Sequence, residues 1–419
     1  MKARAATAFV FVMLLWGMGL TGASGAGLTE LAPWLVRFTG GLKGVYTPVE
    51  GRPLAWSLAW SPSDGTVRKG EVAVTGADLA LRVVLDFDAA DNRLSWRVVE
   101  GRVDLAAWLP ELATRPELAE MLKGMTVTGA LVITGEGTVK DDVVTGELSA
   151  TWAEGKLSNA EQGWSLEGVS IRAGGDMAEL EKGRVPVEVE VRTISTGRFG
   201  ARNFSAKGRL TEEDNVEVQS VRIEIAGGEV MAEPFTVSLE SQKVGVILVM
   251  SRVGLQDLIV FVPTTLSEAR GRINGKLRLD WNPVDGVQIG VGELSLDKSE
   301  PTLLRLVSTP GFLTEQVPAR FVLAPWLGPL KGLFSPKNPS YPTLQEIELG
   351  KLGLRVDALE VRLNPDGDEK GRSASVHIRA RPEREGSAVR EVTFQVNVAG
   401  PLAEVLRMGM QQNLSIQTH

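Results

Sequence analysis

The chain has two histidines and no cysteine, so few of its side chains could do acid–base, nucleophilic or metal chemistry near neutral pH. His377 stands in the alternating stretch Ser375–Arg379, on the side of its polar neighbours, as an exposed strand residue would. His419 is the last residue of the sequence. Without thiolates, the zinc sites and disulfides that cysteine builds are excluded. The sequence therefore predicts neither a catalytic triad nor a histidine-based metal site.

The acidic clusters and short glycine motifs are better explained as turns than as sites. Asp141–Asp142 and Glu212–Asp214 flank turn signals, and acids at turn tips usually serve solubility rather than the glycosidase chemistry that paired carboxylates can do. Gly135–Gly137 lacks the third glycine of a dinucleotide-binding loop. Asp366–Gly371 begins like a calcium-binding loop, but Lys370 stands where an acid is required. We therefore expect no enzyme activity, no cofactor and no bound metal.

The first 26 residues have the order of a secretory signal. Lys2 and Arg4 precede an apolar stretch over residues 5–20, and small residues follow over 21–26. The apolar stretch is shorter than the ~20 residues that a membrane span needs, so we expect cleavage at the end of the small residues. The alternative is an uncleaved N-terminal anchor. Both forms predict a protein that is exported from the cytoplasm.

The rest of the chain limits the possible partners. No later apolar stretch is long enough to cross a membrane, so a multi-spanning transporter is not expected. The formal net charge of −7 argues against a nucleic-acid partner. An exported chain without disulfides has to be stabilised by its core and its sheet.

Alternation of apolar and polar residues, broken by turn residues every 8 to 12 positions, is the commonest pattern and predicts consecutive antiparallel strands. The chain has 46 glycines, which agrees with many turns. Two stretches alternate most clearly, and we take their apolar positions as candidates for a lipid-binding groove. These positions are Val185, Val187, Val189 and Val191 in the first stretch and Val392, Phe394, Val396 and Val398 in the second.

The alternation changes phase in two stretches, residues 216–225 and 354–363. A one-residue phase change is typical of a β-bulge, which bends and twists a strand. The sequence therefore predicts a mainly β fold, built as a curved antiparallel sheet with one apolar and one polar face.

Helical patterns are few and short, over residues 103–112, 116–122 and 401–410. Eight prolines interrupt the segment 301–342. We interpret this segment as an irregular insertion that caps or covers another part of the molecule.

An internal repeat links the two halves of the chain. A helix after Val103, a strand around residues 128–131 and a strand around 146–149 recur as a helix after Val253 and strands around 274–277 and 292–295. Repetition of one unit favours an elongated, stacked architecture. The expected domains are the signal at 1–26, an N-terminal β segment at 27–100, a first helix-plus-strands repeat with its sheet at 101–250, and a C-terminal domain at 251–419.

The C-terminal half contains a series of distinctive motifs. They are Val253-Gly254-Leu255-Gln256-Asp257-Leu258, Ala269–Leu279, Gly286–Ile289, Gly292-Glu293-Leu294-Ser295, Val376–Pro382, Val392–Gly400 and Pro401–Leu406. In these motifs the chain resembles the YdbH-like family, which has also carried a dicarboxylate transport label. The resemblance is clearest over residues 250–419 and fainter from 101. The dicarboxylate label gains no support from these residues, because nothing here predicts repeated membrane spans or a ring of arginines.

The resemblance implies kinship with the AsmA and TamB group of envelope proteins, in which a long curved β-groove carries phospholipid between the two membranes of a Gram-negative cell. It implies a periplasmic protein, tethered to the inner membrane if the signal is not cleaved. The implied partners are phospholipid or another hydrophobic ligand, a membrane surface and other envelope proteins. Candidate contacts to lipid head groups lie in a basic stretch near the end, at Arg372, Arg379, Arg381, Arg384 and Arg390.

Physical reasoning alone leaves other functions open. An apolar sheet face has to be covered by helices, by a second sheet or by an apolar ligand. A closed β-sandwich that acts as a binding module satisfies this requirement as well as a groove does. A structural or assembly factor for the outer membrane, which contacts barrel proteins through its sheet edges, is the main alternative of another class.

Overall fold

The computed structural model describes most of the chain after residue 32. The described residues are 33, 35–46, 53–62, 66–76, 78–112, 119, 122–197, 200–212, 215–238, 241, 243–258, 265–283, 286–321, 336–367 and 371–399. The predicted signal at 1–26, the predicted helix at 401–410 and nearly all of the predicted helix at 116–122 lie outside them.

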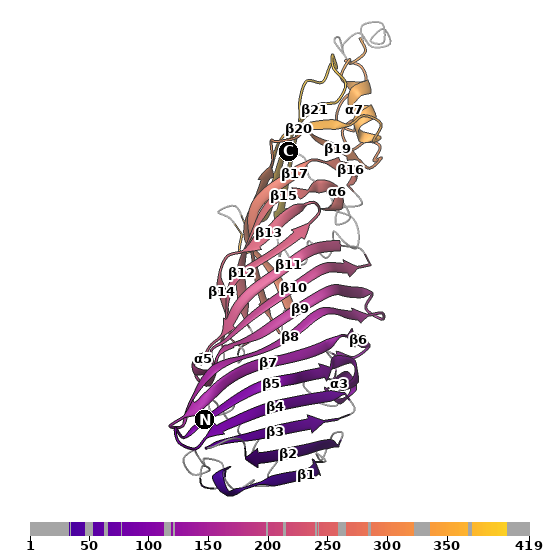
Figure 1. The fold of residues 1–419 in the computed structure, drawn as a ribbon. Coiled ribbons are helices and arrows are strands. Elements are labelled where there is room, and N and C mark those ends of the chain that lie inside the picture. The colour runs from indigo at the N-terminus through magenta and orange to yellow at the C-terminus, as the bar shows by residue number, and fades with distance from the viewer. Residues whose placement is uncertain are drawn as a thin grey trace. The chain divides into compact units, whose positions relative to one another are not determined.

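The described strands form one long, open sheet of 22 strands, and all described pairings are antiparallel (Figure 1). This confirms the mainly β fold with few short helices that the alternation predicts. The chain divides into two compact units, called unit 1 (Met1–Val221 and Pro234–Ser241) and unit 2 (Arg222–Glu233 and Gln242–His419).

Unit 1 is built mostly of hairpins in chain order: β1 to β5 pair in sequence, and β7 to β11 do so as well. Its strands are β1 (Gly40–Tyr46), β2 (Leu54–Pro62), β3 (Val67–Thr75), β4 (Leu79–Asp88), β5 (Arg93–Asp104), β6 (Met125–Thr128), β7 (Ala130–Lys140), β8 (Val143–Asn159), β9 (Trp164–Asp176), β10 (Val185–Thr196), β11 (Gly200–Leu210), β14 (Phe235–Ser238) and most of β12 (Asn215–Ile225).

Unit 2 follows the same antiparallel pattern, with β15 pairing β17, β17 pairing β18, β18 pairing β20 and β20 pairing β21. Its strands are β13 (Gly228–Ala232), β15 (Val244–Gly254), β16 (Leu266–Arg270), β17 (Arg272–Asn282), β18 (Gly286–Leu296), β19 (Thr302–Leu306), β20 (Leu354–Leu363), β21 (Arg372–Pro382) and β22 (Val392–Ala399).

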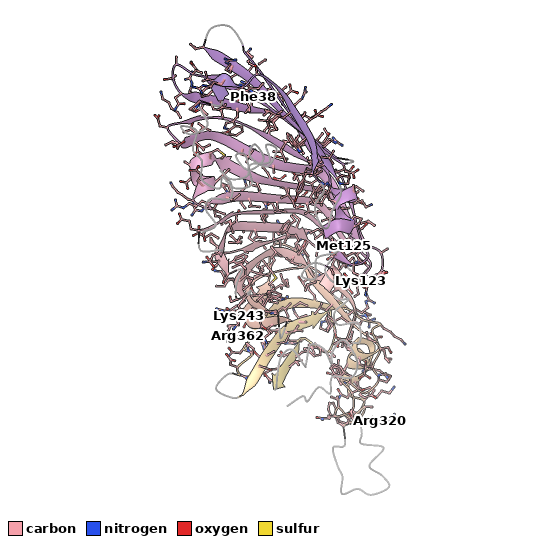
Figure 2. The ribbon with its side chains drawn as sticks, turned by 90° about the horizontal axis from the view of Figure 1, so that it is seen from below. Phe38, Lys123, Met125, Lys243, Arg320 and Arg362 are labelled. Atoms are coloured by element: carbon pink, nitrogen blue, oxygen red, sulfur yellow. The ribbon has the colours of Figure 1, made fainter. Side chains whose placement is uncertain are left out.

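The register gives unit 1 one apolar face and one polar face. Paired residues share a face, and Val187 pairs Ala173 on β9 and Gly208 on β11 while Val189 pairs Ile171 and Ala206. The side chains stand on both sides of the strands (Figure 2). On the polar face, cross-strand ion pairs join Arg97 to Glu136 at 3.0 Å, Lys156 to Glu167 at 2.8 Å and Lys207 to Glu188 at 3.0 Å.

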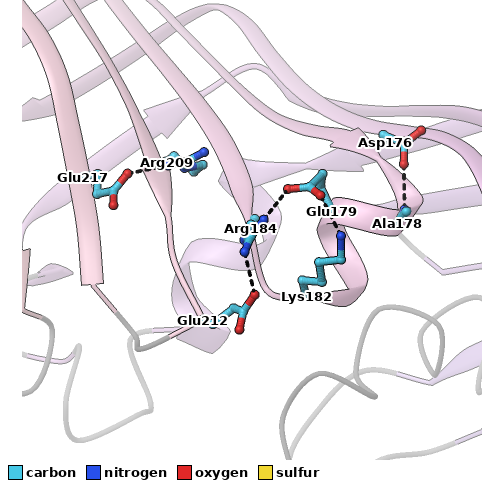
Figure 3. Close-up of polar contacts among 8 residues, drawn as sticks. All are labelled: Asp176, Ala178, Glu179, Lys182, Arg184, Arg209, Glu212 and Glu217. Carbon is cyan, nitrogen blue, oxygen red and sulfur yellow. Dashed lines mark hydrogen bonds and ion pairs between the residues drawn. The ribbon is translucent and has the colours of Figure 1, made fainter.

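Several helical segments of unit 1 fall within the described residues. Helix α3 (Leu105–Leu112) follows β5, α5 (Met177–Glu181) follows β9, and residues 35–37 are helical ahead of β1. Figure 1 shows α3 and α5 at opposite ends of the unit 1 strands. Helix α5 begins at Asp176, whose carboxylate accepts a hydrogen bond from the Ala178 N–H at 2.8 Å (Figure 3).

The helix–strand–strand order expected from the sequence is present in both units. Helices α3 and α6 (Leu255–Leu258) are each followed by a short strand, one glycine and a longer strand, and the strand before the helix pairs with that longer strand. The glycines, Gly129 and Gly271, have φ of +102° and +113°. Their carbonyls accept hydrogen bonds from Leu105 N at 3.2 Å and Leu255 N at 2.9 Å.

Two expectations about local structure have opposite outcomes. The register of β20 and β21 shifts between Val356 and Ala358, which confirms the phase change predicted within residues 354–363. The prediction that the segment 301–342 is irregular is wrong for Thr302–Leu306, which form β19 between β16 and β20. Pro301 lies just outside this strand, so no proline interrupts its ladder of hydrogen bonds.

Candidate functional site

The apolar face of unit 1 has a half-buried middle between two buried sides. We call its central side chains the trough floor: Val83, Val98, Ile133, Leu148, Ala150, Ile171, Ala173, Val187 and Val189, all of them half-buried. The register places them on one face, because Val83 pairs Val98, and the row from Ile133 through Ala150 and Ala173 to Val187 is continuous. These side chains are all aliphatic.

One side of the trough floor is covered by α5 and by the helical residues 35–37. Met177 and Leu180 of α5 pack with Leu35 into a buried cluster that we call the α5 margin. Its strand residues are Leu58, Trp60, Val72, Leu85, Phe87, Leu94, Trp96, Val139 and Val144. The indole N–H of Trp60 donates to the Leu35 carbonyl at 2.8 Å, which fastens the helical residues to the sheet.

Charged residues hold α5 in place beside this margin. Arg184 lies between Glu179 and Glu212, at 3.2 Å from a carboxylate oxygen of each (Figure 3). Hydrogen bonds from Lys182 and then Arg184 lower the pKa of Glu179 below its ordinary value. All four side chains are well exposed, so the cluster orients the helix end more than it stabilises the fold.

The opposite side of the trough floor is covered by α3. Here Val127, Trp152, Val169 and Val191 form a buried cluster, the α3 margin, against which Leu105 and Leu109 of α3 pack. Because the margins are sealed and the floor is not, the unit presents an open apolar strip bounded on two sides.

Glycines opposite tryptophans seal both margins closely. A Cβ on Gly70 would lie 2.1 Å from the Trp60 ring, and one on Gly155 would lie 2.1 Å from the Trp152 ring. Gly137 pairs Trp96 in the register and would meet its ring at 2.9 Å. Sequence reasoning missed these contacts. Gly70 and Gly137 lie on other strands than their tryptophans, and only the register brings them together. Gly155 meets Trp152 of its own strand, where the register shifts between the two residues.

The four valines predicted on β10 cross the whole trough. Val187 and Val189 lie on the trough floor, Val185 packs against the α5 margin, and Val191, 5% exposed, belongs to the α3 margin. Their alternation is identical in sequence, so the difference arises only from what covers each end of the strand. The described strands belong to a single sheet, which argues against the closed β-sandwich left open by the sequence.

The second predicted set lies in unit 2, where a row of half-buried residues runs through the register. We call this row the unit 2 strip: Met250, Leu294, Val361, Val376 and Val396, with Gly275 between the first two. Of the predicted residues, Val396 is in the strip, Phe394 is half-buried beside it and Val392 is 9% exposed. The side chain of Val398 lies outside the described residues.

The five predicted arginines are not gathered on the apolar side. Arg379 and Arg381 alternate with Ile378 and Ala380, so they project from the opposite, polar face of β21. Arg381 forms a two-pronged pair with Asp357, at 2.7 and 2.8 Å. A hydrogen bond from Arg381 and the charges of Arg381, Arg379 and Arg355 keep the pKa of Asp357 below its ordinary value despite its desolvation.

The other three arginines are dispersed. Arg384 pairs Glu346 at 2.8 Å, and Arg372 donates to the Asn397 side chain at 3.2 Å. Arg390 is exposed just before β22. Their role as head-group contacts stays a prediction.

Comparison with known proteins gives one match. A YdbH-like family model, described as intermembrane phospholipid transport protein YdbH, matches residues 18–323. The match starts farther toward the N-terminus than the resemblance noted in the sequence, and it ends before the closing hairpin at β21 and β22. No curated protein and no solved structure matches the chain. Among the described residues, none of the helices has the length and apolar character needed to span a membrane.

Proposed function

The chain belongs to the YdbH-like family of intermembrane phospholipid transport proteins, and on that premise we propose that the trough floor carries the acyl chains of the transported lipid. The family is one of lipid transporters and not of enzymes, and it works in the cell envelope between membranes. Transport thus depends on an apolar surface rather than on reactive groups.

The observation that carries this proposal is the open, half-buried aliphatic strip. Soluble proteins rarely leave a contiguous apolar surface uncovered unless it binds something. Each methylene of an acyl chain that leaves water for such a surface gains about 0.8 kcal/mol, so a chain lying across several strands is held firmly. An acyl chain that moves along the strip exchanges its contacts for equivalent ones, because each next strand places an aliphatic side chain at a matching position along its length.

The head groups remain in water in this arrangement. The trough floor has no charged or polar side chain, and a charge placed on it would lose hydration without gaining a partner. We assign the arginines on the polar face of β21 to a membrane surface rather than to the lipid in transit. Arg355, Arg379 and Arg381 act on the carboxylate of Asp357, and Glu391 also acts on Arg381. These three positive and two negative charges leave a small positive surplus that suits anionic head groups.

We place the chain in the periplasm. Reporter fusions of residues 1–40 that are active only outside the cytoplasm are expected to score positive, and N-terminal sequencing of the mature protein should begin near Ala26. A mature protein that keeps Met1 and fractionates with the inner membrane would replace cleavage by tethering and leave export standing.

The decisive experiment puts a charge on the floor. Val187→Asp should strip phospholipid from the purified full chain, measured by native mass spectrometry, and abolish transfer between vesicles. A carboxylate in a half-open trough can still reach water. We therefore expect the free energy of unfolding to fall by only about 1–2 kcal/mol, which a modest fall in the thermal midpoint would report.

Glu190→Lys is the matched control, because Glu190 lies next to Val189 on the exposed, polar face of the same strand. This control should keep its lipid and its transfer rate. A folded Val187→Asp protein that still carries phospholipid at the wild-type ratio would refute the proposal.

A further inference from the structure

In unit 2 a second layer covers part of the apolar face, over strands β20 to β22. This layer consists of the loop Gly311–Thr314 and helix α7 (Tyr341–Glu348), and we call it the cover. The ring of Phe312 stacks on the ring of Phe394, with centroids 6.4 Å apart and planes at 12°. Leu313 and the fully buried Ile347 pack into the same hydrophobic cluster as Val392.

The surface beneath the cover continues the unit 2 strip. Phe394 pairs Ile378 on β21, and Ile378 pairs Leu359 on β20, one step along the strands from the row of Val361, Val376 and Val396. The two rows lie on the same apolar face, and Phe312 of the cover packs on the second one.

One buried carboxylate fastens the loop to the helix. Glu348 is 2% exposed, and its side chain accepts hydrogen bonds from Leu313 N at 2.9 Å, Thr314 N at 3.0 Å and the Thr314 hydroxyl at 2.7 Å. A buried charge is tolerated only when donors surround it, so the loop is held where it can supply them. Gly311 has φ of +89°, which turns the chain so that the following N–H groups point at the carboxylate.

The other contacts of the cover are weaker. Arg384 pairs Glu346 at 2.8 Å, but the two side chains are 61% and 37% exposed, and such pairs add little. Phe312 and Leu313 themselves are only half-buried, so lifting them exposes limited apolar area.

We propose that the loop Gly311–Thr314 is a lid over a further lipid-binding segment, formed by the apolar face of β20 to β22, with Glu348 of α7 as its latch. An acyl chain that replaces Phe312 against Phe394 keeps the apolar contact, so opening in the presence of lipid exchanges one hydrophobic partner for another. The inference rests on the proposed function, because it requires that an apolar sheet face of this protein holds acyl chains.

Site-specific photocrosslinking in the full chain tests the lid. A photoreactive phenylalanine analogue replaces either Phe394, beneath the lid, or Val187, on the trough floor. The protein is then irradiated with vesicles of phosphatidylethanolamine and phosphatidylglycerol. We expect lipid adducts at position 187 in every background, and at position 394 adducts that rise about tenfold when Phe312→Ala or Glu348→Gln weakens the lid.

Hydrogen exchange shows whether each variant opens the loop. The amides of Leu313 and Thr314 should exchange faster in Glu348→Gln, while those of β20 keep their protection. Phe312→Ala leaves the latch intact, so it tests the lid even if Glu348→Gln misfolds.

The outcomes separate the two proposals. Adducts at 187 together with none at 394 in a variant whose loop exchanges freely would overturn the lid and leave the trough standing. An absence of adducts at 187 in the folded protein would overturn the proposed function itself. Adducts at 394 that are as strong in the wild type as in both variants would show that no lid controls access.

Discussion

Units 1 and 2 present the same kind of surface, a half-buried apolar row on an antiparallel sheet, but they seal its sides differently. Unit 1 does so with two separate buried clusters in which indole rings lie over glycines. Unit 2 has a single aliphatic cluster and a cover fastened by the carboxylate of Glu348. The sheet therefore sets where the apolar surface lies, and the covering elements decide how permanently its sides are closed.

The equivalent glycines sharpen the comparison. After Gly129, unit 1 continues with Ala130, whereas after Gly271 unit 2 continues with Arg272, whose guanidinium donates to the Gly227 and Arg252 carbonyls at 2.6 and 2.8 Å. At this position unit 1 has an apolar side chain, whereas unit 2 has a charged side chain that forms hydrogen bonds. Unit 1 should accordingly be sensitive to side-chain volume, and unit 2 to charge and pH.

The largest effect is expected from filling a glycine in unit 1. The side chain of Gly70→Val would overlap the Trp60 ring. The variant should therefore lower the free energy of unfolding by about 3 kcal/mol or more, measured by chemical denaturation. Gly197→Ala is the control, because a Cβ there meets nothing within 4 Å. Equal stability of the two variants would contradict the packing described for the α5 margin.

An intermediate effect is expected at the latch of unit 2. Burial raises the pKa of Glu348, but hydrogen bonds from the Thr314 hydroxyl and the loop N–H groups outweigh it, so the pKa lies below its ordinary value. The stabilisation is then fully present above about pH 4.3, the ordinary pKa of glutamate, and is lost as the pH falls through the lower folded value.

Glu348→Gln should remove that acid dependence from the loop Gly311–Thr314 and destabilise the loop by about 1–3 kcal/mol at neutral pH. Amide exchange of residues 311–314 as a function of pH measures both effects. Unit 1 strands followed in the same spectra provide the internal reference, and an unchanged pH profile in the variant would assign the acid sensitivity to another group.

The smallest effect is expected on the polar face. Arg381→Met removes the pair with Asp357, but the arginine is 58% exposed, so the unfolding midpoint should move by little more than the error of the measurement. Binding to vesicles rich in phosphatidylglycerol should weaken more visibly, because the variant removes positive charge from the patch. Unchanged vesicle binding would remove the arginines from the membrane contact.

The alternation of the sequence was sufficient to predict the strands and their faces. Val185 to Val191 alternate without interruption, and the phase change near Val356 correctly predicted a bulge. Both signals are local, because successive side chains of a strand point to opposite faces of the sheet whatever packs on each face.

What covers the apolar face could not be read from the same pattern. Val187 and Val191 look alike in sequence, yet only the second is buried, because α3 reaches one end of the strand and not its middle. Helix α5 was missed although Asp176 is a suitable N-cap residue, since five residues give too little periodicity to identify a helix. Glu348 showed no sign of burial in the sequence, because its donors lie 34 and 35 residues away.

The hairpin order of unit 1 also bears on how the protein unfolds. Each strand from β7 to β11 pairs only with its neighbours along the chain, apart from β7 with β5 and β8 with β6. Stability in such an array is a sum of nearest-neighbour terms, so the loss of one strand does not require the loss of all. Cooperativity then decays with the number of strands between two points, so a melting midpoint describes the strands whose signal is followed.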